Sequence, residues 1–193
     1  LRNMLEANVS LQAIEKICNY LGDSNAVLKS KQLPFRFLAA YRELKSINNG
    51  YAGKVLDALE TAVKHSAANI AGYNADTAVV IAADVSGSMQ QAISAKSKVQ
   101  YYDIGLMLAM LLQSRCENVV TGIFGDTWKV INLPKQNILS NVDEFYRREG
   151  EVGYSTNGFL VIKDLLQRKK VVDKVMLFTD CQLWNNTNGG EDI

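Results

Sequence analysis

The apolar positions in the first third of the chain repeat with a helical period. One predicted helix carries on a single face the residues Leu11, Ile14, Ile17 and Leu21. Ser10 is placed to cap this helix, because serine side chains accept hydrogen bonds from the first free N–H groups. Further helices are expected at residues 34–47, where Pro34 fits the first turn, and at residues 52–70. Short connections between such helices favour antiparallel helical pairs.

From residue 78 onward the period changes. The run AVVIAAD, residues 78–84, is apolar almost throughout, as expected of a strand that is covered on both faces of a parallel sheet. The remaining predicted elements are a long buried helix at about 97–114, a hairpin of strands at 119–124 and 128–131, helices at 142–148 and 157–167, and a strand at 174–180. Strands that alternate with helices predict an open, mostly parallel, Rossmann-like α/β sheet.

Composition narrows the class of protein. The chain has 193 residues and a net charge of +1, which gives no strong global attraction to nucleic acid, to membranes or to acidic partners. Its three cysteines are far apart and form no metal-binding pair, which favours a reducing, cytoplasmic setting. No apolar run approaches the roughly 20 residues that a membrane helix needs, so no membrane partner is expected. The segment GYNADT, residues 72–77, predicts a linker between residues 1–72 and 73–193.

The predicted strand 78–84 ends in an unusual cluster of oxygen-bearing side chains. Asp84 is followed by Ser86 and Ser88, with Gly87 between them. Ligands of open α/β sheets collect at the carboxyl ends of the strands, so this cluster lies where a site is expected. One carboxylate and two hydroxyls suit a hard divalent cation, Mg²⁺ or Mn²⁺. The alternative is a capped turn in which these side chains bond only to local N–H groups.

The pattern D-x-S-G-S-M after an apolar strand resembles the metal-ion-dependent adhesion site (MIDAS) of von Willebrand factor A domains. The resemblance implies two further ligands, a later threonine and a later aspartate, for which the candidates are Thr156 in GEVGYSTNG and Asp180 in KVMLFTD. Ser155 is a rival for the threonine position, because tyrosine and serine stand where the family commonly has glycines. Thr156 and Asp180 are otherwise interpreted as ordinary helix or strand-end caps.

The segments LKSKQLPFRFLAAYRELKS and KVLDALETAVKHSAANI resemble the last helices before the A domain in the Ro ribonucleoprotein (TROVE-domain) family. The order of the later motifs agrees with the family as well. The resemblance implies that residues 1–72 end a HEAT-like helical repeat domain and that residues 73–193 form an A domain that is incomplete at its C-terminus. It also implies small non-coding RNA or single-stranded RNA ends as partners. Basic side chains that are candidates to face phosphates are Lys29, Lys31, Arg36, Arg42 and Lys45.

Three hypotheses of function follow. The first is a Ro-type RNA-binding protein, active in non-coding RNA binding or RNA quality control, with a cation site in its A domain. The second is an A domain that assembles with a protein partner whose acidic residue completes the metal sphere, without RNA. The third is a Mg²⁺-dependent phosphoryl-transfer enzyme with Asp84 as nucleophile, but Ser86 stands where such an enzyme needs an acid. We therefore expect no enzymatic activity.

Overall fold

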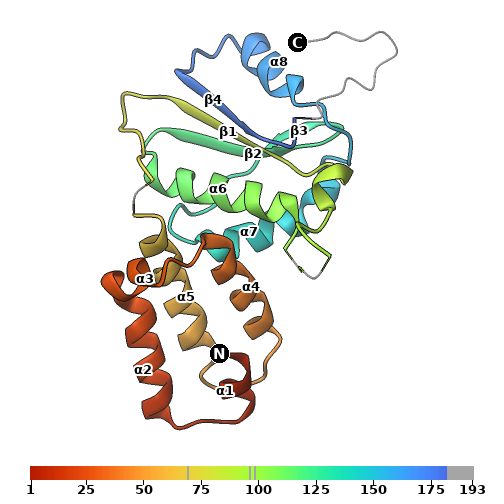
Figure 1. The fold of residues 1–193 in the computed structure, drawn as a ribbon. Coiled ribbons are helices and arrows are strands. Elements are labelled where there is room, and N and C mark those ends of the chain that lie inside the picture. The colour runs from red at the N-terminus through yellow and green to blue at the C-terminus, as the bar shows by residue number, and fades with distance from the viewer. Residues whose placement is uncertain (69, 96, 98, 182–193) are drawn as a thin grey trace. The chain divides into compact units, whose positions relative to one another are not determined.

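The computed structural model describes residues 1–68, 70–95, 97 and 99–181. The chain divides into two compact units (Figure 1). The helical unit comprises Leu1–Ile70 together with Asn137–Leu139, and the α/β unit comprises the remaining residues. The predicted assignment of these parts to a TROVE-like domain and a von Willebrand factor A-like domain stays a prediction.

The helical unit contains five helices within its described residues: α1 (Arg2–Glu6), α2 (Leu11–Gly22), α3 (Ser24–Ser30), α4 (Pro34–Lys45) and α5 (Ala52–Ser66). Ser10 caps α2 as predicted, because its hydroxyl accepts the N–H of Ala13 at 3.3 Å. The helix α5 packs against α2, α3 and α4. Its buried stripe includes Val55, Leu59 and Val63, each no more than 1% exposed. The unit is therefore built around one apolar helix face.

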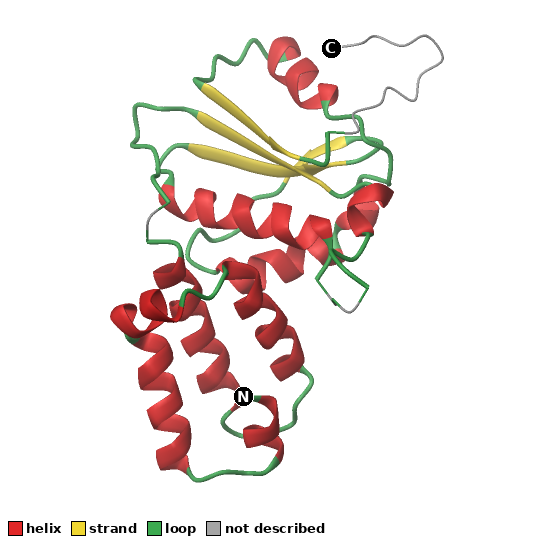
Figure 2. Cartoon of the chain, in the orientation of Figure 1, coloured by secondary structure: helices red, strands yellow, loops and turns green. Residues whose placement is uncertain are grey.

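The α/β unit is organised by a four-stranded sheet in the order β3-β2-β1-β4 (Figure 2). Its strands are β1 (Val79–Asp84), β2 (Val119–Phe124), β3 (Trp128–Val130) and β4 (Lys174–Phe178). β1 pairs in parallel with both β2 and β4, whereas β3 is antiparallel to β2. All six residues of β1 are buried, as expected for a central strand that is covered on both faces. The predicted open, mostly parallel α/β sheet is confirmed.

Helices cover both faces of this sheet (Figure 1). On one side α6 (Tyr101–Arg115) contacts β1, β2 and β4. On the other side α8 (Phe159–Gln167) places Val161 against Val80, Ala82 and Phe124. The helix α7 (Ile138–Arg147) and two 3-10 turns, η1 (Gly87–Gln90) and η2 (Glu149–Glu151), complete the described elements. Among the described residues, none of the helices combines the length and apolarity needed to cross a membrane.

Several predicted boundaries were wrong for local reasons. α6 begins at Tyr101 rather than near residue 97, because Gln100 and Asp103 form a reciprocal capping box. α8 begins two residues later than predicted, since the N–H of Asn157 donates to the carbonyl of Gly125. α7 begins earlier than predicted, at Ile138. The short helices α1 and α3 were not predicted individually, because five and seven residues carry too little periodicity.

Candidate metal centre

The candidate site is built where β1 and β4 end. The parallel register pairs Ala83 with Phe178, so the next residues along, Asp84 and Thr179, come to lie side by side. The Thr179 hydroxyl donates a hydrogen bond of 2.6 Å to Oδ2 of Asp84. Thr179 in turn accepts the N–H of Cys181 at 3.2 Å. The chain after β4 is thus tied directly to the aspartate.

The serines of the motif fold back on the same aspartate. The backbone N–H of Ser86 donates to Oδ1 of Asp84 at 2.9 Å. The hydroxyls of Ser86 and Ser88 lie 3.2 Å apart and share a hydrogen bond. Asp84 and Ser86 are each 1% exposed, whereas Ser88 is half-buried. The structure therefore brings Asp84, Ser86 and Ser88 together as predicted, although the N–H bond from Ser86 also belongs to the capped-turn alternative.

The Asp84 carboxylate lies in a buried setting that disfavours its negative charge. Burial raises its pKa, and hydrogen bonds from Thr179 and Ser86 offset part of that rise. The neighbouring charge of Asp180 raises the pKa of Asp84 further. No lysine, arginine or histidine pairs with Asp84 within residues 1–68, 70–95, 97 and 99–181. A buried carboxylate of this kind gains stability from an added positive charge.

The loop that carries Thr156 is tied to the serine turn. The N–H of Gly87 donates to the carbonyl of Tyr154 at 2.9 Å. Thr156 follows two residues later and is 7% exposed. Within the described part of the chain, the hydroxyl of Thr156 makes no side-chain hydrogen bond. Its oxygen therefore remains available to bind an ion. The contact between the two loops is made by Gly87 and Tyr154, and the side chain of the rival candidate, Ser155, is hydrogen-bonded to Asp126.

Asp126 holds this threonine loop in place. Its carboxylate accepts the N–H of Ser155 at 2.9 Å, and hydrogen bonds from the side chain and the backbone of Ser155 lower the pKa of Asp126. The loop also passes so close to the β2–β3 turn that a side chain on Gly125 would collide with the carbonyl of Gly153. Gly153 itself has a φ of +73°, a conformation that glycine adopts without strain. Two glycines and one aspartate thus fix the loop's position.

The donor set fits a hard cation. Asp84 and Asp180 supply carboxylates, and Ser86, Ser88 and Thr156 supply hydroxyls, so every candidate ligand is an oxygen. Among the described residues, no group of three or more His, Cys, Asp and Glu side chains is placed to hold a metal ion. Any cation here must therefore rely on hydroxyls and water beside the two aspartates. That composition disfavours zinc and favours Mg²⁺ or Mn²⁺.

Sequence reasoning missed two residues of this region, Thr179 and Asp126. Thr179 directly precedes the predicted ligand Asp180, and its role follows once β4 is placed beside β1. Asp126 was interpreted only as part of a hairpin turn. Cys181, which follows Asp180, is exposed and donates its backbone N–H to the hydroxyl of Thr179.

The five basic residues that are candidates to face phosphates differ in their surroundings and form two groups. Lys29, Lys31 and Arg36 are exposed around the turn between α3 and α4, and none of them forms an ion pair with another described residue. Arg36 lies 5.8 Å from the ring centroid of Phe35. Lys45 instead lies 5.7 Å from the ring centroid of Tyr41, and Arg42 is half-buried. The first group, which we call the α3–α4 basic turn, is the more accessible to phosphates.

Comparison with known proteins supports the fold. No family model and no curated protein matches the sequence. Among solved structures, the chain is similar to the Ro (RSR) protein of Deinococcus radiodurans, with a TM-score of 0.60 and 18% sequence identity. The match covers 97% of this chain and 39% of that one. At this identity the likeness shows a shared fold, and it extends through both units.

Proposed function

We propose that this chain is part of a Ro-type RNA-binding protein. The observation that carries the proposal is the structural match to the Deinococcus Ro (RSR) protein, which spans the helical unit and the α/β unit in one alignment. The sequence motifs that resemble the Ro family occur in the same order along the chain. The chain spans 39% of the length of that relative, so the activity and partners of a whole Ro protein are part of the proposal.

The helical unit is proposed to bind the RNA, either a small non-coding RNA or a single-stranded end. Support comes from the α3–α4 basic turn, whose side chains Lys29, Lys31 and Arg36 are exposed and form no ion pair with another described residue. Phosphate contacts by such cations release counterions, so the affinity should fall steeply with salt. By contrast, Glu43 is engaged by Arg2 at 2.9 Å and does not face the basic turn as an ion-pair partner.

The α/β unit is proposed to hold Mg²⁺ or Mn²⁺ through Asp84, Ser86, Ser88, Thr156 and Asp180. The burial of the Asp84 carboxylate and the neighbouring charge of Asp180 support this role. Such an ion would supply a positive charge that can accept an acidic group from outside. The hydroxyl ligands add no negative charge, so only Asp84 and Asp180 would offset the charge of the ion, which would keep much of its Lewis acidity. The protein's own side chains would hold and orient the ion.

RNA binding is tested by charge reversal on the helical unit. Lys29→Glu and Arg36→Glu should each weaken binding of a single-stranded RNA several-fold at moderate salt and reduce the slope of affinity against salt. Lys16→Glu on α2 is the matched control, because Lys16 is equally exposed and has no ion pair among the described residues. Equal effects of all three changes would contradict a specific role for the α3–α4 basic turn.

The other two hypotheses of function, protein assembly and phosphoryl transfer, each predict a different result. Protein assembly without RNA would be favoured if the chain bound no RNA and captured an acidic peptide only with Mg²⁺ present. Phosphoryl transfer would require Mg²⁺-dependent turnover that Asp84→Asn abolishes. The burial of Asp84, and the presence of Ser86 where a phosphoryl-transfer enzyme needs an acid, support a binding role over catalysis. A cytoplasmic location stays a prediction.

A further inference from the structure

A groove on the α8 side of the sheet lies away from the metal ligands. It has a volume of about 510 Å³, which is within the range of roughly 300–1,000 Å³ typical of small-ligand sites. Its apolar lining comes from both the sheet and α8: Val80, Val120, Trp128, Val130, Val161 and Leu165. Its polar lining is Lys129, Asn132, Asp164, Arg168 and Lys170. The groove is thus apolar at its floor and mainly cationic at its rim.

The indole of Trp128 is the largest flat surface in this groove. A β-carbon added to Gly122 would lie 2.6 Å from the Cη2 atom of Trp128, so the ring lies directly over the glycine. Any larger residue at position 122 would push the ring away from the sheet. Trp128 is half-buried, and it lines the groove while resting on β2. The structure therefore holds an aromatic platform in a fixed position.

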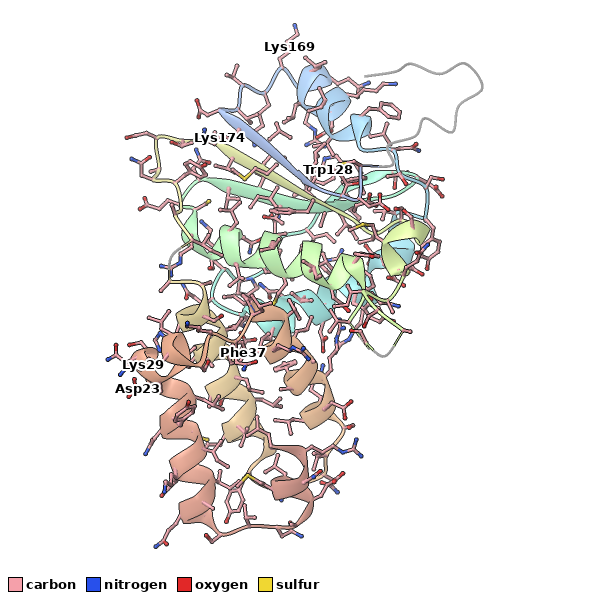
Figure 3. The ribbon with its side chains drawn as sticks, in the orientation of Figure 1. Asp23, Lys29, Phe37, Trp128, Lys169 and Lys174 are labelled. Atoms are coloured by element: carbon pink, nitrogen blue, oxygen red, sulfur yellow. The ribbon has the colours of Figure 1, made fainter. Side chains whose placement is uncertain are left out.

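The cations at the rim are also placed by the fold. At the end of α8, Lys169 has a φ of +51°, and the N–H groups of Lys169 and Lys170 donate to the carbonyls of Leu166 and Leu165. This is the Schellman arrangement that closes a helix and turns the chain back on itself. Lys169 extends into solvent (Figure 3), whereas Lys170 lines the groove. Lys170 makes no ion pair with another described residue, so its charge is available.

The other rim charges are partly compensated. Arg168 pairs with Asp164 at 2.7 Å, and Lys129 pairs with Glu151 at 2.6 Å. These pairs are exposed and therefore weak, so an incoming phosphate competes with the carboxylates at little cost. Three cations and one carboxylate line the groove itself, which leaves an excess of positive charge. The occupant should combine a planar apolar part with a negative charge.

We propose that this groove is a second RNA contact, in which one base of a single strand stacks on Trp128 and the adjoining phosphate lies against Lys170 and Arg168. Aromatic platforms combined with basic side chains are the usual means by which proteins hold single-stranded nucleic acid. The choice of RNA among polyanions rests on the proposed function, but the site lies in the α/β unit and does not depend on the α3–α4 basic turn. The same cations also stabilise the C-terminal end of α8.

The test uses the fluorescence of Trp128. The chain has two tryptophans, so Trp184→Phe leaves Trp128 as the sole reporter. Short single-stranded oligouridine should quench this fluorescence, and duplex RNA of the same length should not. In the same background, Lys170→Ala should weaken binding several-fold and lower the salt slope by about 0.7, the share of one phosphate contact. Lys163→Ala is the matched control, because Lys163 is exposed on α8 but does not line the groove.

A second measurement removes the platform. With a labelled oligouridine, Trp128→Ala should weaken binding about 5- to 150-fold, the loss expected for one stacked base, whereas Trp128→Phe should retain most of the affinity. Circular dichroism identifies a variant that fails to fold, and the quenching experiment on the intact platform then decides. Absence of quenching, equal quenching by duplex RNA, or equal effects of Lys170→Ala and Lys163→Ala would each overturn the proposal. Displacement of oligouridine by an aspartate-rich aromatic peptide at lower concentration would overturn it in favour of a protein partner.

The experiments distinguish a groove that binds no RNA from a helical unit that binds no RNA. If Lys29→Glu abolishes RNA affinity while Trp128 fluorescence never responds, the helical unit binds RNA and the groove does not. If Trp128 is quenched and Lys170→Ala weakens binding while Lys29→Glu has no effect, the groove proposal stands and the assignment of RNA to the helical unit is wrong.

Discussion

The hydroxyl of Thr179 donates a 2.6 Å hydrogen bond to the carboxylate of Asp84. This bond joins the ends of two strands that are 95 residues apart in sequence. It also gives the buried Asp84 carboxylate a donor beside the N–H of Ser86. The geometry of the candidate metal centre therefore depends on a residue that need not bind the ion itself.

Replacement of Thr179 tests that dependence. Thr179→Val keeps the shape of the side chain but removes the donor, so the buried carboxylate loses a charge-assisted hydrogen bond. The metal-free protein should lose roughly 1.5–3 kcal/mol of unfolding free energy at neutral pH, as measured by urea denaturation. Thr179→Ser retains the hydroxyl and should lose less than about half of that amount. Equal stability of the valine and serine variants would show that the bond contributes little.

Replacement of Asp84 separates stability from metal binding. Burial disfavours the ionised carboxylate, so Asp84→Asn should raise the melting temperature of the metal-free protein at neutral pH. Mg²⁺ should stabilise the wild type by mass action and leave the variant unchanged. Asp76→Asn, at an exposed position, is the matched control and should respond to Mg²⁺ like the wild type. Stabilisation of Asp84→Asn by Mg²⁺ to the same extent would exclude Asp84 as a ligand.

The residues of the candidate metal centre that are close together in sequence were predicted, and the residue that strand pairing brings to it was not. Asp84, Ser86 and Ser88 were predicted because they follow a recognisably buried strand within five residues. Thr179 was missed because its position beside Asp84 depends on the register of β1 against β4, which only the pairing defines.

The threonine loop was predicted less completely for a similar reason. Much of its anchoring uses backbone atoms, such as the carbonyl of Tyr154 and the N–H of Ser155, and backbone groups leave no mark in the residue pattern. The strands and long helices were predicted because burial imposes a period on many consecutive residues. The ends of the helices were not predicted accurately, because a cap such as the one between Gln100 and Asp103 depends on one or two side chains and not on a repeated pattern.

Gly122 provides a test of packing that is independent of ligands. A β-carbon there would lie 2.2 Å from the carbonyl oxygen of Lys129, so Gly122→Ala must displace β3 or the indole of Trp128. We expect a loss of about 1–3 kcal/mol in unfolding free energy and a shift in tryptophan emission. Gly53→Ala in α5 is the control, since nothing lies within 4 Å of the added carbon and helix propensity favours alanine by up to about 1 kcal/mol. Similar destabilisation of both variants would contradict the close approach at Gly122.

The last prediction concerns pH and two glutamates of the same 3-10 turn, η2. Burial raises the pKa of Glu149, and the nearby charge of Asp103 raises it further. One of its carboxylate oxygens is buried without a hydrogen-bond partner in the described structure. Because the folded pKa exceeds the unfolded one, Glu149 contributes stability that is present below about pH 4.5 and is lost as pH rises through the folded pKa. Glu149→Gln should therefore make the protein more stable at pH 7, and the gain should shrink as the pH is lowered towards 4.5.

Glu151 should behave in the opposite way. Arg148 and Lys129 lower its pKa to about 2, so its stabilising contribution is present above about pH 4.5 and is lost as pH falls towards 2. Its ion pairs are exposed, so Glu151→Gln should reduce stability at pH 7 only slightly and should leave it unchanged near pH 2. Urea denaturation of the wild type and both variants between pH 2 and pH 7 measures the two effects. If Glu149→Gln were less stable than the wild type at pH 7, the ionised Glu149 would have a stabilising partner, and the account of this turn as a buried acidic position beside Asp103 would be wrong.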